Sequence, residues 1–265
     1  MLPGVYKAVK KDGTVYYRSN ITFRNKHISL GSFPEESLAA DAYREAGNLL
    51  SDSSCTLENL DFCDYLLSFD KIVTLVNFRD NGFYIKTPIY LRKGYFSYFL
   101  SPSEELKFDI DDLFYYSSHK ILRRQGRLFV NDYGMQLSIA SRYGIRAHAV
   151  AGRDYLFVNG DTLDYRYSNI LVQNPYHGVN RIERNGKIRY KAAIHINGVY
   201  VVGTYSSEIN AAIAYNKAAD LAQKYGIGKN FPENYIVDIT AKEYAERYTK
   251  LSISKKYINY LETLV

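Results

Sequence analysis

Residues 4–50 read GVYKAVKKDGTVYYRSNITFRNKHISLGSFPEESLAADAYREAGNLL, and a similar stretch returns at residues 178–222 as GVNRIERNGKIRYKAAIHINGVYVVGTYSSEINAAIAYNKAADLA. The matched positions are Gly4 with Gly178, Gly13 with Gly186, Tyr17 with Tyr190, Ile21 with Ile194, Gly31 with Gly203, and Ala42-Tyr43 with Ala214-Tyr215. The separation drifts only from 174 residues at Gly4 to 172 at Gly31, so two short deletions align the copies. Such self-similarity is typical of one supersecondary block used twice.

Each copy has the pattern of a three-stranded antiparallel sheet followed by a helix. Alternating segments are separated by Asp12-Gly13 in copy one and by Asn185-Gly186 in copy two, dipeptides that favour a tight two-residue hairpin turn. In residues 17–24, Tyr, Ser, Ile and Phe alternate with Arg, Asn, Thr and Arg, which predicts one buried face and one face open to solvent or phosphate. Helices are then expected from Pro34-Glu35-Glu36 and from Ser206-Ser207-Glu208.

Composition and charge limit the class of protein. The chain has 265 residues, 46% of them hydrophobic, which favours two or three small domains. Lys and Arg total 34 against 28 Asp and Glu, and this net charge of +6 favours an anionic partner. Cys55 and Cys63 are too few for a disulfide framework or a four-cysteine metal cluster. No apolar run approaches the roughly 20 residues that cross a bilayer. We therefore expect a cytoplasmic protein, nucleoid-associated if bacterial, without a membrane segment, metal or cofactor.

The shared segments carry a specific resemblance. Each copy contains an aromatic-basic-small-x-Ile strand, followed by Leu/Val-Gly-x-aromatic and then by Ala-Ala-x-Ala-Tyr. This pattern resembles the Apetala-two/ethylene-response-factor DNA-binding domain, including its bacterial and phage versions. In that family the exposed sheet face enters the major groove of duplex DNA. By position, the resemblance implies contacts in copy one from Tyr6, Arg18, Asn20, Thr22, Arg24, Lys26, His27 and Ser29. In copy two it implies contacts from Asn180, Arg181, Arg189, Lys191, Ala193 and His195.

Both copies depart from the family on the outward face. The first-strand arginines of the plant members are absent, so the resemblance transfers no base preference. Copy two turns Val199 and Val201 outward on its third strand, where copy one has His27 and Ser29. We expect this apolar pair to face either thymine methyl groups or a protein partner. The alternative for each sheet is a small structural module with an ordinary basic solvent face.

The segment between the copies resembles a nuclease domain. Residues 159–170, NGDTLDYRYSNI, resemble the Asn-Gly-Asp-x-Leu-Asp-Asn-Arg-x-Ser-Asn-Leu segment of phage HNH homing endonucleases. The run KFDIDDLFYYSSHKILRRQGRLFVNDYG from Lys107 resembles the beginning of that domain, where an acidic turn and a short helix precede a hairpin with a glycine. The basic residues of this hairpin are predicted either to contact phosphate or to form a solvated face: Arg123, Arg124 and Arg127.

The residues that perform HNH chemistry are missing. The reaction needs a histidine base, a polar group that orients it and ligands for one divalent metal. The family's Asp-His pair is Leu156-Phe157 here, its orienting Asn is Tyr165, and no histidine stands near residues 135–138, where its first one is expected. The resemblance therefore implies a degenerate domain without catalytic or metal-binding residues. The motif keeps Gly160 for a turn, Asp161 and Asp164 for backbone capping, and Ser168-Asn169 for a helix start.

We expect an α+β chain in which residues 1–50 and 177–235 are Apetala-two-like modules around a degenerate HNH-like domain at 81–176. Residues 51–80 are a connector that either packs on the core or acts as a spacer, and residues 236–265 are a helical tail that either docks or makes a homodimer contact. The predicted function is sequence-selective binding of double-stranded DNA by an inactive regulator. The alternatives are a metal-dependent endonuclease with another base, such as His148, and a module that binds another protein. Both His119 and His148 are interpreted as surface or hydrogen-bonded residues.

Overall fold

The structure, a computed structural model, describes residues 2–146 and 149–264 of the chain. Two compact units are present, of which unit 1 comprises Met1–Ile139 and Val158–Ile170. Unit 2 comprises Ala140–Phe157 and Leu171–Val265. Helices accompany four three-stranded antiparallel sheets and one two-stranded sheet in the described ranges, so the predicted α+β class is confirmed. None of the helices in these ranges has the length and apolar character needed to span a membrane.

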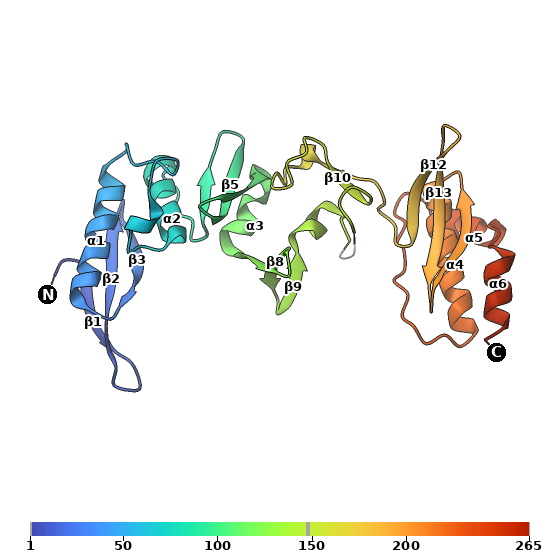
Figure 1. The fold of residues 1–265 in the computed structure, drawn as a ribbon, viewed down its shortest axis with the longest axis horizontal. Coiled ribbons are helices and arrows are strands. Elements are labelled where there is room, and N and C mark those ends of the chain that lie inside the picture. Colours follow the sequence, from blue (N-terminus) through green and yellow to red (C-terminus); the bar gives the residue numbers. More distant parts are fainter. Residues whose placement is uncertain (1, 147–148, 265) are drawn as a thin grey trace. The chain divides into compact units, whose positions relative to one another are not determined.

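The first repeat folds as a three-stranded sheet with a helix packed on one side (Figure 1). Its elements are β1 (Val5–Val9), β2 (Val15–Phe23), β3 (Lys26–Phe33) and α1 (Glu36–Ser51). The alternation predicted for β2 is confirmed, because Ser19 and Ile21 are buried whereas Arg18 is exposed. Alanines on one side of α1 are fully buried, and their small side chains let the helix lie close to the sheet.

The second repeat has the same order in unit 2 (Figure 1). Its elements are β12 (Val179–Arg184), β13 (Lys187–His195), β14 (Val199–Tyr205) and α4 (Glu208–Lys224). Ser207 caps α4, since its side chain accepts a hydrogen bond from Asn210 N at 3.5 Å. The tail adds α5 (Ala241–Lys250) and α6 (Lys255–Glu262). Tyr257 and Leu261 of α6 are buried in the core of this module, so the tail docks on it.

The two hairpin turns differ between the copies. Asn185-Gly186 forms the predicted two-residue turn between β12 and β13, with φ angles of 54° and 67°. The same expectation for Asp12-Gly13 is wrong, because β1 ends at Val9 and β2 begins only at Val15. There the Asp12 side chain accepts a hydrogen bond from Thr14 N at 2.9 Å and closes a longer loop.

A glycine packed against a tyrosine holds the same corner of each copy. Gly4 has φ +71° and Gly178 has φ +70°, a conformation that glycine adopts without strain. A Cβ at Gly4 would stand 2.2 Å from the ring of Tyr43, and one at Gly178 would stand 2.3 Å from the ring of Tyr215. Neither position has room for a side chain, so one packing contact explains two of the matched positions of the repeat.

The connector is part of the first module's core. It contains η1 (Phe62–Asp64) and α2 (Phe69–Asn81). Ile72 and Leu75 of α2 are buried in the same cluster as Ile28 of β3. Arg79 reinforces the contact, because its guanidinium donates to the backbone oxygens of Leu49, Asp52 and Cys55 at 2.6 to 2.9 Å. The segment therefore packs on the core, the first of its two alternatives.

The rest of unit 1 has its own aromatic core. Two sheets form it, with a short turn and helix between them: β4 (Ile89–Leu91), β5 (Tyr95–Ser101), β6 (Glu104–Asp109), η2 (Ile110–Asp112), α3 (Leu113–Ser118), β7 (Ile121–Arg124), β8 (Arg127–Asp132) and β9 (Met135–Ser138). Phe96, Phe108 and Tyr116 are fully buried in it. The order of acidic turn, short helix and glycine-containing hairpin agrees with the prediction from the sequence.

The motif at residues 159–170 folds differently from its prediction. The elements around it are η3 (Ile139–Tyr143), β10 (Tyr155–Phe157), η4 (Tyr167–Asn169) and β11 (Ile170–Val172). Ser168-Asn169 was expected to start a helix, and this is wrong, since a single 3-10 turn leads directly into β11. The side chain of Asn169 explains the outcome, because it donates to the backbone oxygens of Asp161 and Asp164 and so closes the preceding loop.

Candidate nucleic-acid interface

The side of the first sheet opposite α1 carries a set of polar residues. Antiparallel register pairs Tyr6 with Arg18, Asn20 with Ser29, and Thr22 with His27, so all six project to that side. Arg18, Thr22, His27 and Ser29 are exposed there, and Tyr6 retains 51% of its surface. Five of them line a shallow hollow, namely Tyr6, Arg18, Asn20, His27 and Ser29. We call these six residues the N-terminal face.

Local contacts hold parts of the N-terminal face in position. Arg18 Nη2 donates to Tyr16 Oη at 2.7 Å, and its guanidinium lies 5.4 Å from the centre of the Tyr16 ring. Thr22 Oγ1 and His27 Nδ1 form a hydrogen bond of 2.9 Å across the two strands. Side chains ordered before binding lose less conformational freedom when a partner arrives.

Arg24 and Lys26 do not belong to this face, contrary to the positions implied by the resemblance. β2 ends at Phe23, and Arg24-Asn25 forms a turn with positive φ angles of 44° and 62°. Arg24 Nη1 donates to the backbone oxygen of Phe78 at 3.2 Å. Lys26 pairs with Phe23, which packs on the core side of the sheet, and its Nζ lies 5.3 Å from the centre of the Tyr84 ring. Both cations stabilise the module on the side away from the hollow.

The second sheet presents an outward side of the same design. Register pairs Asn180 with Lys191, Ala193 with Val201, and His195 with Val199. Arg189 pairs with Ile182 on the same side. We call these the C-terminal face, and its residues are Asn180, Ile182, Arg189, Lys191, Ala193, His195, Val199 and Val201. Val199 keeps 70% of its surface exposed and Val201 keeps 42%, so the apolar pair is open as predicted.

Arg181 lies on the other side of this sheet, which corrects its assignment to the face. It pairs with Tyr190, and Tyr190 packs against the core of the module. Alternation along β12 therefore puts Arg181 with buried Val179 and opposite to Asn180. His195 remains on the face, where Lys229 Nζ lies 3.1 Å from its Nδ1 and donates to its backbone oxygen at 2.8 Å.

The two faces correspond residue by residue. A register shift after Ser19 in copy one matches the shift after Ala192 in copy two. Consequently Arg18 corresponds to Lys191, whereas hydrogen-bonding Asn20, His27 and Ser29 correspond to apolar Ala193, Val199 and Val201. The repeat keeps the cation at one position and changes the chemistry of the positions beside it.

Sequence reasoning missed two cations at the hairpin end of the C-terminal face. Arg184 and Lys187 pair across the Asn185-Gly186 turn and have the same strand parity as Arg189 and Lys191. Both are exposed, and the described part of the chain shows no ion pair for either. The sequence contains the signal for Lys187, because Lys187, Arg189 and Lys191 are alternate residues of one strand and therefore lie on the same side.

The central hairpin holds its three arginines in different settings. Arg124 and Arg127 face each other across a two-residue turn at Gln125-Gly126. Arg123 points to the other side and is engaged by Glu104, whose two carboxylate oxygens each accept a hydrogen bond from its guanidinium. The phosphate contact from Arg123 stays a prediction, and such a contact would compete with the ion pair to Glu104.

Hydrogen bonds between its own residues hold the loop at residues 159–170 together. Asp164 is fully buried, and Arg166 Nε and Nη2 donate to its carboxylate at 2.9 and 2.6 Å. Burial acts to raise the pKa of Asp164, but the bonds from Arg166 outweigh it and hold that pKa below its ordinary value. Asn159 Nδ2 adds a further bond at 3.0 Å. Asp164 Oδ1 also accepts a hydrogen bond from the backbone N of Arg166 at 3.1 Å, which confirms the backbone capping predicted for Asp164.

The residues at the positions that the resemblance assigns to HNH chemistry do not fit a divalent metal. Leu156 and Phe157 have no ligand atoms, and Asn169 is occupied by the backbone of its own loop. Across residues 2–146 and 149–264, no three His, Cys, Asp or Glu side chains gather in a metal-binding group. His119 is hydrogen-bonded, with Nδ1 2.9 Å from Tyr115 O, while His148 lies outside the described residues.

No family model, curated protein or solved structure matches this chain.

Proposed function

We propose that the protein binds double-stranded DNA in a sequence-selective way, using the N-terminal and C-terminal faces as two separate reading surfaces. One observation carries the proposal. The strand residues that point outward on the two sheets include five cations, namely Arg18, Arg184, Lys187, Arg189 and Lys191. No Asp or Glu is found among the outward-pointing strand residues that the structure describes in either sheet. A surface with cations and hydrogen-bonding groups but no carboxylate complements the phosphate backbone and the base edges of a duplex.

The dimensions of each sheet suit the major groove. Neighbouring strands lie about 4.8 Å apart, so three strands are roughly 10 Å wide, against about 12 Å for the groove. The nine residues of β2 and of β13 extend about 30 Å at about 3.3 Å each. On the N-terminal face, Arg18 and Asn20 have the side-chain chemistry that reads guanine and adenine edges. On the C-terminal face, Val199 and Val201 offer apolar contact to thymine methyl groups.

The test is a fluorescence-anisotropy titration of the full-length protein with a labelled pool of random duplexes at 50 and 200 mM salt. We expect binding that weakens steeply with salt, and selection from the pool should then enrich defined sequences. Arg18→Gln and Lys191→Gln should weaken the binding, whereas Asn20→Ala should change the preferred bases. The proposal is wrong if no duplex binds at 50 mM salt.

A plasmid-nicking assay with Mg²⁺ or Mn²⁺ separates this function from that of an endonuclease. The proposal expects no cleavage above the background, because the positions of the HNH base and its partner hold Phe157 and Leu156. Metal-dependent nicking that survives purification and disappears in a His119→Ala or His148→Ala variant would assign the chain to the endonucleases instead.

A further inference from the structure

A pocket opens at one end of the C-terminal face, beyond the start of β12. β12 begins at Val179, paired with Ala192, whereas β13 continues to His195. The corner left beside the last residues of β13 is a cavity of about 270 Å³. Face residues Asn180, Ala193 and His195 line it from the sheet side. Such a volume suits a small group better than a whole cofactor, whose sites occupy about 300–1,000 Å³.

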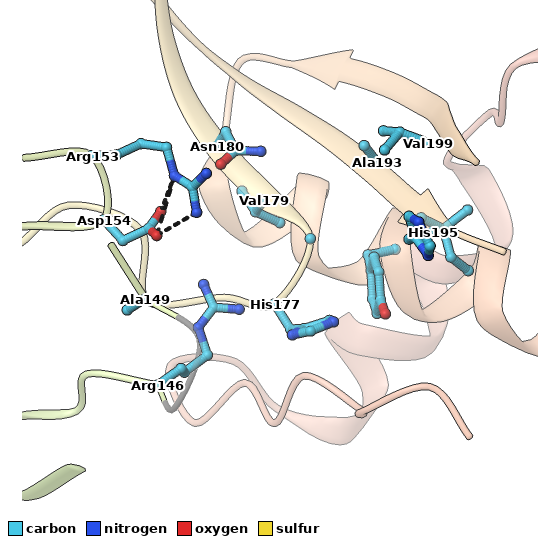
Figure 2. Close-up of a pocket in the computed structure, with 13 residues that line it drawn as sticks. Arg146, Ala149, Arg153, Asp154, His177, Val179, Asn180, Ala193, His195 and Val199 are labelled. Carbon is cyan, nitrogen blue, oxygen red and sulfur yellow. Dashed lines mark hydrogen bonds and ion pairs between the residues drawn. The ribbon is translucent and has the colours of Figure 1, made fainter. Parts of the chain in front are cut away.

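The opposite wall is basic (Figure 2). Arg146 and Arg153 come from the segment Ala140–Phe157 of the same unit, and His177 precedes the sheet. Asp154 is the carboxylate in this wall, but it is 6% exposed and pairs with Arg153 at 2.7 Å. Val150 N and the Asn174 side chain also donate to Asp154. The charges of Asp154 and Arg153 thus compensate each other.

Arg146 is the cation in the pocket that forms no ion pair within the described residues. Its guanidinium is half-buried, and Nη2 donates to the uncharged backbone oxygen of Asn174 at 2.6 Å. Burial lowers the pKa of Arg146, although Asp154 and Glu208 act against that shift. A half-buried guanidinium that forms no ion pair with the described residues favours an anionic ligand with several oxygens.

The first module shows what the second has gained. Its hollow lies at the corresponding place and is lined by Tyr6, Asn20, His27 and Ser29 together with Arg18, all from the sheet itself. Asn180, Ala193 and Val199 of copy two correspond to three of these residues. The basic wall around Arg146 is therefore an addition to copy two and not a general consequence of the repeat.

We infer that this pocket binds one phosphate group, with Arg146 as the principal ligand and Asn180 and His177 beside it. The inference rests on the proposed function for the source of the phosphate, which is the backbone of a duplex lying on the C-terminal face. A guanidinium presents parallel N–H groups to two phosphate oxygens, and its position at the end of the face suits the strand that borders the groove.

Two matched pairs of variants test the inference in the full-length protein. Arg146→Gln removes the charge and Arg146→Lys keeps it. Ala149→Asp puts a carboxylate into the pocket, and Ala149→Asn adds the same volume without charge; Ala149 lines the pocket and its backbone N donates to Arg146 O. We expect Arg146→Gln to reduce the slope of log K against log salt by about 0.9, and Arg146→Lys to retain it. Ala149→Asp should bind duplex roughly fivefold more weakly than Ala149→Asn.

A second readout uses inorganic phosphate alone. At constant ionic strength set with chloride, phosphate should shift the Nε–H NMR signal of Arg146 to a saturating value, and Ala149→Asp should abolish the shift. If the signal saturates but the DNA salt slope is the same in Arg146→Gln, the pocket takes free phosphate and the assignment to the DNA backbone is wrong. If the wild type binds no duplex while the signal still saturates, the proposed function falls and the pocket stands. An unmoved signal together with an unchanged slope overturns the inference.

Discussion

Removing a positive charge from one side or the other of the same sheet separates recognition by a face from general attraction to DNA. Lys191 and Arg181 lie on adjacent strands of the C-terminal module. Lys191 pairs with Asn180 on the outward side, whereas Arg181 pairs with Tyr190 on the side of the core. Lys191→Gln and Arg181→Gln therefore change the net charge equally and differ only in the side of the sheet that they alter.

The expected magnitude follows from the cations on the two faces. Five of them point outward from the strands, namely Arg18, Arg184, Lys187, Arg189 and Lys191. If each neutralises one phosphate, these five cations alone give log K against log salt a slope of about −4.5, which is roughly a 500-fold loss of affinity between 50 and 200 mM. Lys191→Gln should reduce the slope by about 0.9 and weaken binding roughly fivefold at 0.15 M salt. Arg181→Gln should leave the slope unchanged.

The assay is a fluorescence-anisotropy titration with one selected duplex at five salt concentrations, with each variant's secondary structure checked by circular dichroism. The same comparison in copy one uses Arg18→Gln and Lys7→Gln, because Lys7 pairs with Tyr17 on the side of the core. Equal losses of slope for the outward and inward members of either pair would refute the reasoning, since attraction would then depend on net charge alone.

Three further predictions concern readout, packing and pH. Alternating A·T duplexes with deoxyuridine in place of thymidine should bind roughly fourfold more weakly per methyl contact, and the double variant Val199→Ser/Val201→Ser should bind both duplexes equally; competition anisotropy measures this, and equal wild-type binding contradicts it. Gly186→Ala, at φ 67° in open space, should lower the free energy of unfolding by about 1 kcal/mol, and Gly178→Ala should lower it by roughly 1–3 kcal/mol more because its methyl group meets the Tyr215 ring. Equal melting temperatures for the two variants would refute the packing contact. Because the pKa of Asp164 is lowered in the folded protein, its hydrogen bonds stabilise the fold at any pH above the ordinary pKa of an aspartate, about 3.9. This stabilisation is lost as the pH falls through the lowered pKa. Arg166→Gln should therefore unfold at higher pH in an acid titration by circular dichroism, and an unmoved midpoint would deny the role of this pair.

Local patterns were sufficient for the repeated modules. Alternation in residues 17–23 placed Arg18, Asn20 and Thr22 on one side of the sheet, and the register confirms it. The resemblance added candidates by position, and it failed where position and geometry disagree. Arg24 lies outside the N-terminal face because β2 ends one residue before it, in a turn that contains no glycine. Arg181 lies outside the C-terminal face because it has the strand parity of the core side, which alignment to a family does not take into account.

The middle of the chain was less predictable because its interactions are distant in sequence. Whether Arg123 is available to a partner depends on Glu104, which lies on another sheet. The helix expected at Ser168-Asn169 did not form because Asn169 satisfies backbone oxygens of the loop before it. Neither outcome has a signal in the residues adjacent to the site, since each depends on which groups the folded chain brings within hydrogen-bond distance.

The amino-acid sequence by itself determined that one sheet-and-helix block occurs twice, where each block begins, and which strand residues share a side. These properties follow from periodicity and turn chemistry, which act between near neighbours. Only the tertiary structure decided which cations remain uncompensated, because charge neutralisation is a matter of distance in space. Arg24, Arg123 and Arg153 are satisfied by groups in the fold, whereas Arg146, beside the C-terminal face, forms no ion pair with the described residues.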